Sequence, residues 1–239
     1  MMLQEIKPGF RYLWLLMLAY VMSLAFANWF DPRLIKLFGI VTDAGTLIFP
    51  LSYIASDLIT EVYGYKHARR AIWTGFMFNL LFIVYGFLVT HMPSPSYAKI
   101  NVAFDRIIGM DARIIAASIV SYFVAEPLNS LIMAKFKILT EGRLLWFRFL
   151  FSTFVASFFD SAIFGSIAFI GIISSSALIQ LIIDMWLIKV VIEAVMLPIS
   201  TRLAPWLKLK EKMDIFDQRT KFTLFSLDDS YCVEDNRFK

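Results

Sequence analysis

Acidic side chains lie deep inside three hydrophobic stretches of this 239-residue chain. They are Glu126, Asp160 and Glu193, and Lys189 stands one helical turn before the last of them. A charged side chain at the centre of a bilayer costs roughly 2.5–3.5 kcal/mol even on the most lenient insertion scale. We therefore expect these groups to face one another around a polar cavity inside a membrane bundle, which is typical of a transporter.

The stretch around Glu126 places several polar groups on one helical face. Asn129 follows at i+3 and Ser130 at i+4, while Pro127 removes one backbone hydrogen bond and bends the helix. A carboxylate, an amide and a free carbonyl can then converge on a substrate. The alternative is that Glu126 forms a buried ion pair with Arg148 or Lys189.

Asp160 and Lys189 each lie near the middle of a hydrophobic stretch. Lys189 is either the counter-ion of Asp160 or is neutralised by Glu193, and the spacing allows both. Asn79 lies halfway along an earlier stretch, where its amide either joins two helices or contacts substrate. Five residues are therefore candidates for substrate binding: Glu126, Asn129, Asp160, Asn79 and Lys189.

Asp57 and Glu61 stand at i and i+4, so their like charges share one helical face and repel unless cations are near. Lys66, Arg69 and Arg70 follow closely in the sequence. One interpretation is a helix end held by ion pairs to this basic loop. The other is a gate or a proton-handling pair. The candidate gating or structural ion-pair residues are Asp57, Glu61, Arg69, Arg70, Arg148 and Glu193.

The composition predicts an all-α membrane protein. Hydrophobic residues make up 59% of the chain and charged residues only 18%, whereas a soluble domain has about 25% charged residues. A membrane span needs roughly 20 apolar residues, and six stretches qualify: 12–30, 40–61, 71–91, 112–134, 149–172 and 177–201. We expect residues 1–239 to form a single integral membrane domain with one six-helix bundle and a polar cytoplasmic tail at 203–239.

Two of the expected segments have internal features. Gly45 and Pro50 predict that the span 40–61 is either broken or kinked. The outer loop before residue 112 is the longest connection between spans, and loops of about 20 residues are often functional lids. Its apolar residues, such as Phe104 and Ile108, indicate that part of it re-enters the membrane or lies on its surface.

The distribution of basic residues predicts the orientation. Of the 23 lysines and arginines, 17 fall in the N-terminal segment, in the loops after the second and fourth spans, and from Arg202 onward. Basic residues concentrate on the cytoplasmic side of membrane proteins, so both termini are expected there. The net charge of +4 is then explained by the membrane surface, and no nucleic-acid partner is expected.

Motifs for catalysis or metal binding do not occur in the sequence. There is no GxxxxGK[ST] phosphate loop, no HExxH, no cysteine cluster and no GxSxG elbow. We expect no catalytic residues, no metal site and no cofactor.

One long block of the sequence resembles a known family. Residues 56–66 (SDLITEVYGYK) and 68–76 (ARRAIWTGF), with 126–130 (EPLNS), Asp160, Lys189 and Glu193 further along, resemble the signature of the queuosine precursor transporter family, also described as vitamin-uptake-like transporters. The resemblance covers roughly residues 40–225. It departs from the family at Ser157, where glutamine is frequent, at Pro127, where an aromatic residue is common, and at 223–225.

The resemblance implies a bacterial inner-membrane, multi-pass importer of 7-cyano-7-deazaguanine or its aminomethyl relative. The implied fold is similar to the substrate-binding components of energy-coupling-factor transporters. A deazaguanine offers two adjacent donors that match one carboxylate, Glu126 or Asp160, and an O6 acceptor that matches Asn129, Asn79 or Lys189. Phe164, Phe123 or Trp146 are candidates for stacking.

Other functions remain open at the level of sequence. One is the substrate-binding subunit of a multi-protein importer for another vitamin-like molecule, and another is a multipass membrane enzyme. The expected partners are a small deazapurine and membrane lipid. Whether a coupling ion or separate energising subunits drive uptake is not decided by the sequence.

Overall fold

The structure is a computed structural model that describes residues 10–31, 33–37, 39–109 and 112–238. Residues 1–9 of the expected cytoplasmic N-terminal segment lie outside these ranges. The elements follow one another as α1 (Leu13–Phe30), β1 (Leu34–Leu37), β2 (Ile40–Asp43), the 3₁₀ turn η1 (Gly45–Leu47), α2 (Pro50–Tyr63), α3 (Tyr65–Thr90), α4 (Asn101–Gly109), α5 (Ala112–Leu139), α6 (Leu145–Phe169), α7 (Ser175–Glu211) and the 3₁₀ turn η2 (Val233–Asp235).

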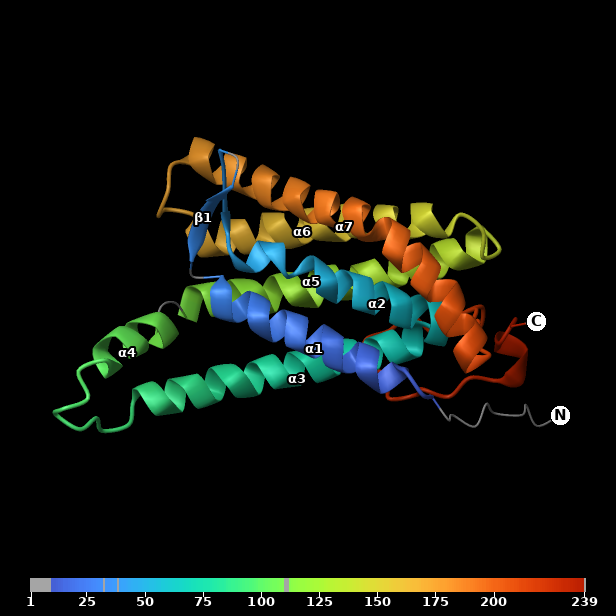
Figure 1. Cartoon of the computed structure of the whole chain (residues 1–239), viewed down its shortest axis with the longest axis horizontal. Coiled ribbons are helices and arrows are strands. Elements are labelled where there is room, and N and C mark those ends of the chain that lie inside the picture. Colours follow the sequence, from blue (N-terminus) through green and yellow to red (C-terminus); the bar gives the residue numbers. More distant parts are fainter. Residues whose placement is uncertain (1–9, 32, 38, 110–111, 239) are drawn as a thin grey trace.

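The long helices run side by side in one bundle (Figure 1). The chain travels along the bundle six times, in α1, in the segment from β1 to α2, and in α3, α5, α6 and α7. Helix α5 packs on α6, α6 on α7, and α2 touches α1, α3, α5 and α7. The start of α1 and the C-terminal tail lie at one end, which we call the tail end, and the β1–β2 hairpin and α4 lie toward the other (Figure 1).

Among the described residues, four helices are long and apolar enough to cross a membrane: α1, α3, residues 116–139 of α5, and α6. Their outward faces carry large apolar side chains, such as Trp14 and Phe26 on α1 and Leu81 on α3. Helix α7 is the longest, but Asp184, Lys189 and Glu193 interrupt its apolar character. Helix α2 has only 14 residues, about 21 Å at 1.5 Å per residue.

The expected span 40–61 is not one continuous helix. Its first residues form β2, which pairs antiparallel with β1, and the 3₁₀ turn η1. Helix α2 begins at Pro50, a residue that fits the first turn of a helix because it has no backbone N–H to donate. The segment 40–61 is therefore broken, as one of the two interpretations predicted, and its first part forms a strand of the hairpin and the turn η1 instead of a helix.

Glycine permits the sharp junction between α2 and α3. Gly64 adopts φ +86°, a conformation that residues with a side chain rarely take. A Cβ atom there would lie 2.4 Å from the Tyr231 hydroxyl and 2.7 Å from Ile215. The residue thus lets the tail pack directly against the α2–α3 corner.

The remaining helix boundaries agree with the expected spans to within several residues. The last helix is an exception, since α7 continues to Glu211, so the polar tail begins about nine residues later than the expected 203. The long loop before residue 112 contains one short helix, α4, which contacts α3.

Candidate functional site

A hollow of about 620 Å³, counting its open mouth, lies among α1, the hairpin segment, α3, α5, α6 and α7. Most of this volume is the open mouth, and the space that a water-sized molecule can occupy is about 50 Å³. Its polar lining includes the side chains Asn28, Asp31, Asp43, Asn79, Asp160 and Lys189, and its aromatic lining consists of Phe49, Phe76, Tyr122 and Phe164. We call it the upper pocket, since it lies in the part of the bundle away from the tail end.

Asp160 and Lys189 form the ion pair of the upper pocket. The Lys189 ammonium donates to Asp160 Oδ2 at 2.5 Å, and both residues are almost fully buried. The same ammonium lies 4.9 Å from the centre of the Phe49 ring, a cation–π arrangement. Of the two partners expected for Lys189, the structure selects Asp160 and not Glu193.

Two further carboxylates of the upper pocket were not among the candidate site residues. Asp43 accepts hydrogen bonds from the Thr46 backbone N–H at 2.6 Å and the Thr46 hydroxyl at 2.7 Å, and these local bonds stabilise the start of η1. Asp31 ends α1 and packs against Gly45, where a Cβ atom would lie 1.7 Å from Asp31 Oδ1. The sequence of the segment Thr42–Thr46 could have indicated the role of Asp43, because Asp and Thr three residues apart beside a glycine are typical of a polar turn.

The acidic groups outnumber the cation in this pocket. Asp31, Asp43 and Asp160 are balanced by Lys189 alone among the lining residues described. Such a lining favours a ligand that presents several hydrogen-bond donors.

The two amides of the upper pocket bind each other. Asn28 on α1 donates from Nδ2 to Asn79 Oδ1 on α3 at 2.9 Å. Asn79 therefore joins α1 and α3, which was one of its two expected roles. It also lines the pocket.

Glu126 and Asn129 lie outside the lining of the upper pocket. Ser52 donates to Glu126 at 3.3 Å, and Tyr20 also interacts with the carboxylate. Asn129 donates from Nδ2 to Asp57 Oδ1 at 2.6 Å, and Asp57 also accepts from Ser152 at 3.4 Å. The alternative for Glu126, an ion pair with Arg148 or Lys189, does not form, since Arg148 pairs with Glu61 and Lys189 with Asp160.

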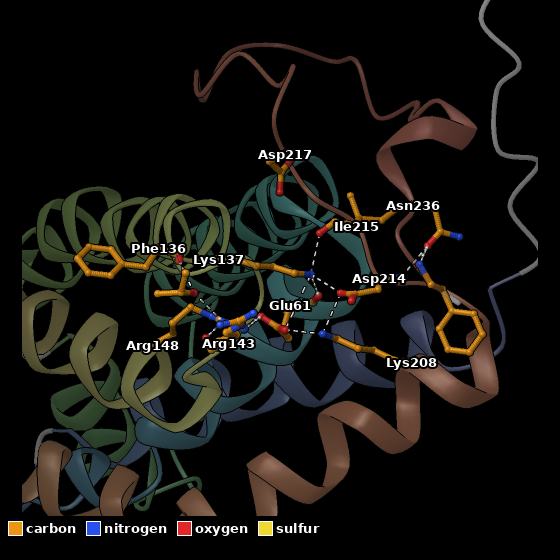
Figure 2. A network of polar contacts seen from close by, with 12 residues as sticks. Glu61, Phe136, Lys137, Arg143, Arg148, Lys208, Asp214, Ile215, Asp217 and Asn236 are labelled. Atoms are coloured by element: carbon orange, nitrogen blue, oxygen red, sulfur yellow. Dashed lines mark hydrogen bonds and ion pairs between the residues drawn. The ribbon is translucent and has the colours of Figure 1, made fainter.

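Glu61 lies at the centre of a buried charge network near the tail end (Figure 2). Arg148 on α6 donates to Glu61 Oε2 at 2.8 Å, and Lys208 on α7 donates to Oε1 at 2.5 Å. Lys137 on α5 donates to the Glu61 carbonyl at 2.5 Å, and both lysines pair with Asp214, at 2.6 and 2.8 Å. Helices α2, α5, α6 and α7 thus meet at the Glu61 carboxylate, and Asp214 of the tail binds the two lysines. We call this set of contacts the Glu61 network.

The expected ion pairs of Asp57 and Glu61 with the basic loop are not present. Arg69 donates instead to the carbonyls of Thr223, at 3.0 Å, and of Asp228, and Arg70 pairs with Asp229. These arginines bind the tail because α3 turns away from α2 at Gly64. The partners of Glu61 come from distant parts of the sequence, and spacing along one helix did not reveal them.

The tail is fastened to the α2–α3 corner by Asp217. Its carboxylate accepts from the Tyr65 backbone N–H at 2.9 Å and from the Tyr231 hydroxyl at 2.5 Å. Burial raises the pKa of Asp217 above its usual value, and burial also raises the pKa of Tyr231. These contacts hold the tail against the end of the bundle that contains the Glu61 network.

Of the aromatic candidates for stacking, Phe164 lines the upper pocket. Phe123 packs instead on Phe76 and Trp73. Trp146 stands at the tail-end start of α6 and is 51% exposed.

An apolar helical bundle with a charged internal pocket is the architecture of a membrane transport protein. Residues 43–203 match the family described as "Putative vitamin uptake transporter", and the chain belongs to this family. It is 29% identical over 175 residues to the "Probable queuosine precursor transporter" of Bacillus subtilis (strain 168), which covers 72% of this chain and 76% of the relative. No solved structure matches the chain.

Proposed function

We propose that the protein imports a queuosine precursor, 7-cyano-7-deazaguanine or a related deazapurine, across the bacterial inner membrane. The observation that carries this proposal is the upper pocket, whose three carboxylates, two amides and flanking aromatic rings are complementary to a donor-rich planar base. Family membership and the name of the Bacillus subtilis relative support the same substrate class.

The proposed topology has six spans in one domain, with both termini cytoplasmic. The six passes of the chain and the shared end of α1 and the tail support it (Figure 1). The basic residues Lys137, Arg148 and Lys208 lie near that end, as expected of a cytoplasmic face. The upper pocket then faces the outside, where a precursor must first be captured.

In this proposal Asp160 accepts from the N1–H and exocyclic amine of the base, and Asn79 or Lys189 donates to O6. Phe164 or Phe49 stacks on the ring plane. Asp31 and Asp43 are additional acceptors at the outer side of the pocket. Glu126 and Asn129 lie deeper, so they would contact a substrate only after it has moved toward the tail end.

The Glu61 network is the proposed inner gate. It joins α2, α5 and α7 with α6 through Arg148, and it closes the bundle on the side opposite the upper pocket. Release of substrate to the cytoplasm requires that these ion pairs separate, since they connect the helices that surround the path.

The test is restoration of queuosine in tRNA in a bacterial host that lacks both precursor synthesis and its own importer, supplied with the deazapurine at low concentration. We expect the expressed protein to restore the modification. A well-expressed protein that restores nothing would refute the proposal.

A second experiment separates a complete carrier from a binding subunit. The purified protein alone is placed in liposomes, and exchange of radiolabelled deazapurine is followed. We expect exchange without any other protein. If exchange needs separate ATPase and coupling proteins, the chain is the binding subunit of a larger importer.

A further inference from the structure

Three carboxylates below the upper pocket have no cationic partner among the residues that the structure describes. They are Asp57 on α2, Glu126 on α5 and Glu193 on α7, and each is at most 1% exposed. Asp57 interacts electrostatically with both Glu193 and Glu126. The neighbouring cations are already engaged, since Lys189 pairs with Asp160 and Arg148 with Glu61.

The same region contains buried polar atoms without a hydrogen-bond partner. Both carboxylate oxygens of Glu193, Glu126 Oε2 and Asn129 Oδ1 belong to this set, as do the hydroxyls of Thr153 and Ser157 on α6. Asn129 binds Asp57 through Nδ2, and its own oxygen is left without a partner. A buried polar atom without a partner is costly, and several together indicate an occupant that binds and leaves.

Tyr53 connects this cluster to the upper pocket. Its ring is fully buried, lies 5.3 Å from the Phe49 ring that lines the pocket, and carries a hydroxyl with no partner. Four carboxylates act on this hydroxyl: Asp160 in the pocket, and Glu126, Asp57 and Glu193 below it. A hydroxyl in this position can accept a proton on one side and donate one on the other.

A small cation suits this cluster, because every unpartnered group named above is an acceptor oxygen or a hydroxyl that can accept. In the described part of the chain, no three acidic, histidine or cysteine side chains converge closely enough to hold a metal ion. The carboxylates are thus spread along the bundle and do not form one cage. Separated buried carboxylates with hydroxyls in the same region are typical of a proton relay.

We propose that Asp57, Glu126 and Glu193, linked to the upper pocket through Tyr53, carry the protons whose inward movement drives substrate accumulation. A proton from outside water adds to a carboxylate oxygen and forms a neutral carboxylic acid. It later leaves to cytoplasmic water and regenerates the carboxylate, with no redox change. Neutral acids remove the like-charge repulsion in the cluster, so helices α2, α5 and α7 can rearrange around the loaded site.

This inference rests on the proposed import function, and the experiment separates the two. Liposomes with the purified protein are assayed for exchange of labelled deazapurine at equal concentrations, which reports import competence alone. They are then assayed for net accumulation with an inside-alkaline pH gradient, no sodium, and the membrane potential clamped to zero. A gradient of one pH unit can drive about tenfold accumulation for each proton carried.

The informative variants are Glu193→Gln, Asp57→Asn and Tyr53→Phe. We expect Glu193→Gln and Asp57→Asn to retain exchange but to lose accumulation and its dependence on pH. Tyr53→Phe should slow accumulation more than exchange. Glu193→Asp should restore part of the accumulation, because it keeps a titratable group. The matched control is Asp184→Asn on the same helix, since Asp184 binds Gln180 near the exposed outer end and should behave as wild type.

Three results would overturn the inference. One is wild-type accumulation driven by a sodium gradient with no pH gradient. Another is full pH-driven accumulation in Glu193→Gln and Asp57→Asn. The third is loss of exchange together with accumulation in variants that remain folded and abundant, because that result assigns the carboxylates to substrate binding. Absence of exchange in the wild type would instead refute the proposed function itself.

Discussion

Lys189 on α7 and Asp160 on α6 form a 2.5 Å ion pair inside the upper pocket, and each is the other's charged partner there. The pair explains how two charged residues persist in the interior of an apolar bundle. Changing one member has different consequences from changing the other, because among the described lining residues Lys189 alone balances three carboxylates.

We predict that Asp160→Asn lowers both membrane abundance and substrate affinity. Loss of one partner from a buried ion pair costs about 3–5 kcal/mol because the remaining charge is uncompensated. The lost charge-assisted hydrogen bond to substrate, about 1.5–3 kcal/mol, weakens binding roughly tenfold to a hundredfold. The double variant Asp160→Asn with Lys189→Met should regain abundance but not uptake. Quantitative immunoblots and uptake kinetics measure the two effects, and normal transport in Asp160→Asn would remove the residue from the site.

We predict that Glu61→Gln opens the tail end of the bundle. The change leaves Arg148 and Lys208 without their shared carboxylate. In a protein whose only cysteine, Cys232, is replaced by serine, a Ser56→Cys probe reports access to the interior. Labelling from the cytoplasmic face in inverted vesicles should be faster in Glu61→Gln.

The control for this probe is Glu211→Gln at the same end of the bundle. Glu211 accepts from the Tyr63 hydroxyl and the backbone of Tyr12 and does not belong to the Glu61 network. Equal labelling rates in both variants would argue against a gate at Glu61.

Gly45→Ala should abolish uptake while leaving the bundle folded. The new methyl carbon would lie 2.5 Å from the carbonyl oxygen of Ala27, a backbone atom that cannot rotate away, and 1.7 Å from Asp31 Oδ1. The hairpin must therefore shift and distort the pocket. Gly86→Ala is the matched control, because its methyl meets only Ile108, at 3.0 Å. Substrate-dependent thermal stabilisation should be lost in the first variant and kept in the second.

Acid should release part of the tail from α3. The hydrogen bond from Lys66 lowers the pKa of Asp228 to about 2, below its usual value of about 3.9. A carboxyl with a lowered pKa adds stability that is present above the usual pKa and is lost as the pH falls through the lower one. Pepsin should therefore cut residues 225–231 faster at pH 2 than at pH 4. The Lys66→Met variant should be cut fast at both values, and a pH-independent rate in the wild type would contradict the assignment.

The sequence predicted the helices wherever apolar residues dominate. It did not predict the hairpin, where backbone N–H and C=O groups form hydrogen bonds between neighbouring strands. The bounds of α1, α3, α5 and α6 follow from hydrophobic length. The hairpin did not follow, since apolar residues such as Ile40 and Val41 fit a strand as well as a span. Asp43 provides the polar turn that ends the strand, an effect of one side chain that hydropathy averages out.

The residue types that line the upper pocket could be predicted from the sequence, but their pairing only as open alternatives. Asp160, Lys189 and Asn79 were identified because polar groups in apolar helices are costly. Their partners depend on how helices rotate against one another, which spacing along a single helix does not determine. The meeting of Glu61 with Lys208 joins residues 147 positions apart, so only the packed bundle reveals it.

The short hairpin has a consequence for how the protein is made. Strand β2 and the turn η1 contact α7, although α7 is synthesised more than a hundred residues later. Non-helical backbone at membrane depth is tolerated only where protein or water shields it from lipid. The hairpin segment therefore cannot settle when it leaves the ribosome and must wait for the last helix. The upper pocket is accordingly completed only after α7 is in place, and we expect a chain truncated before α7 to present the unshielded strand edges of the hairpin to quality-control proteases.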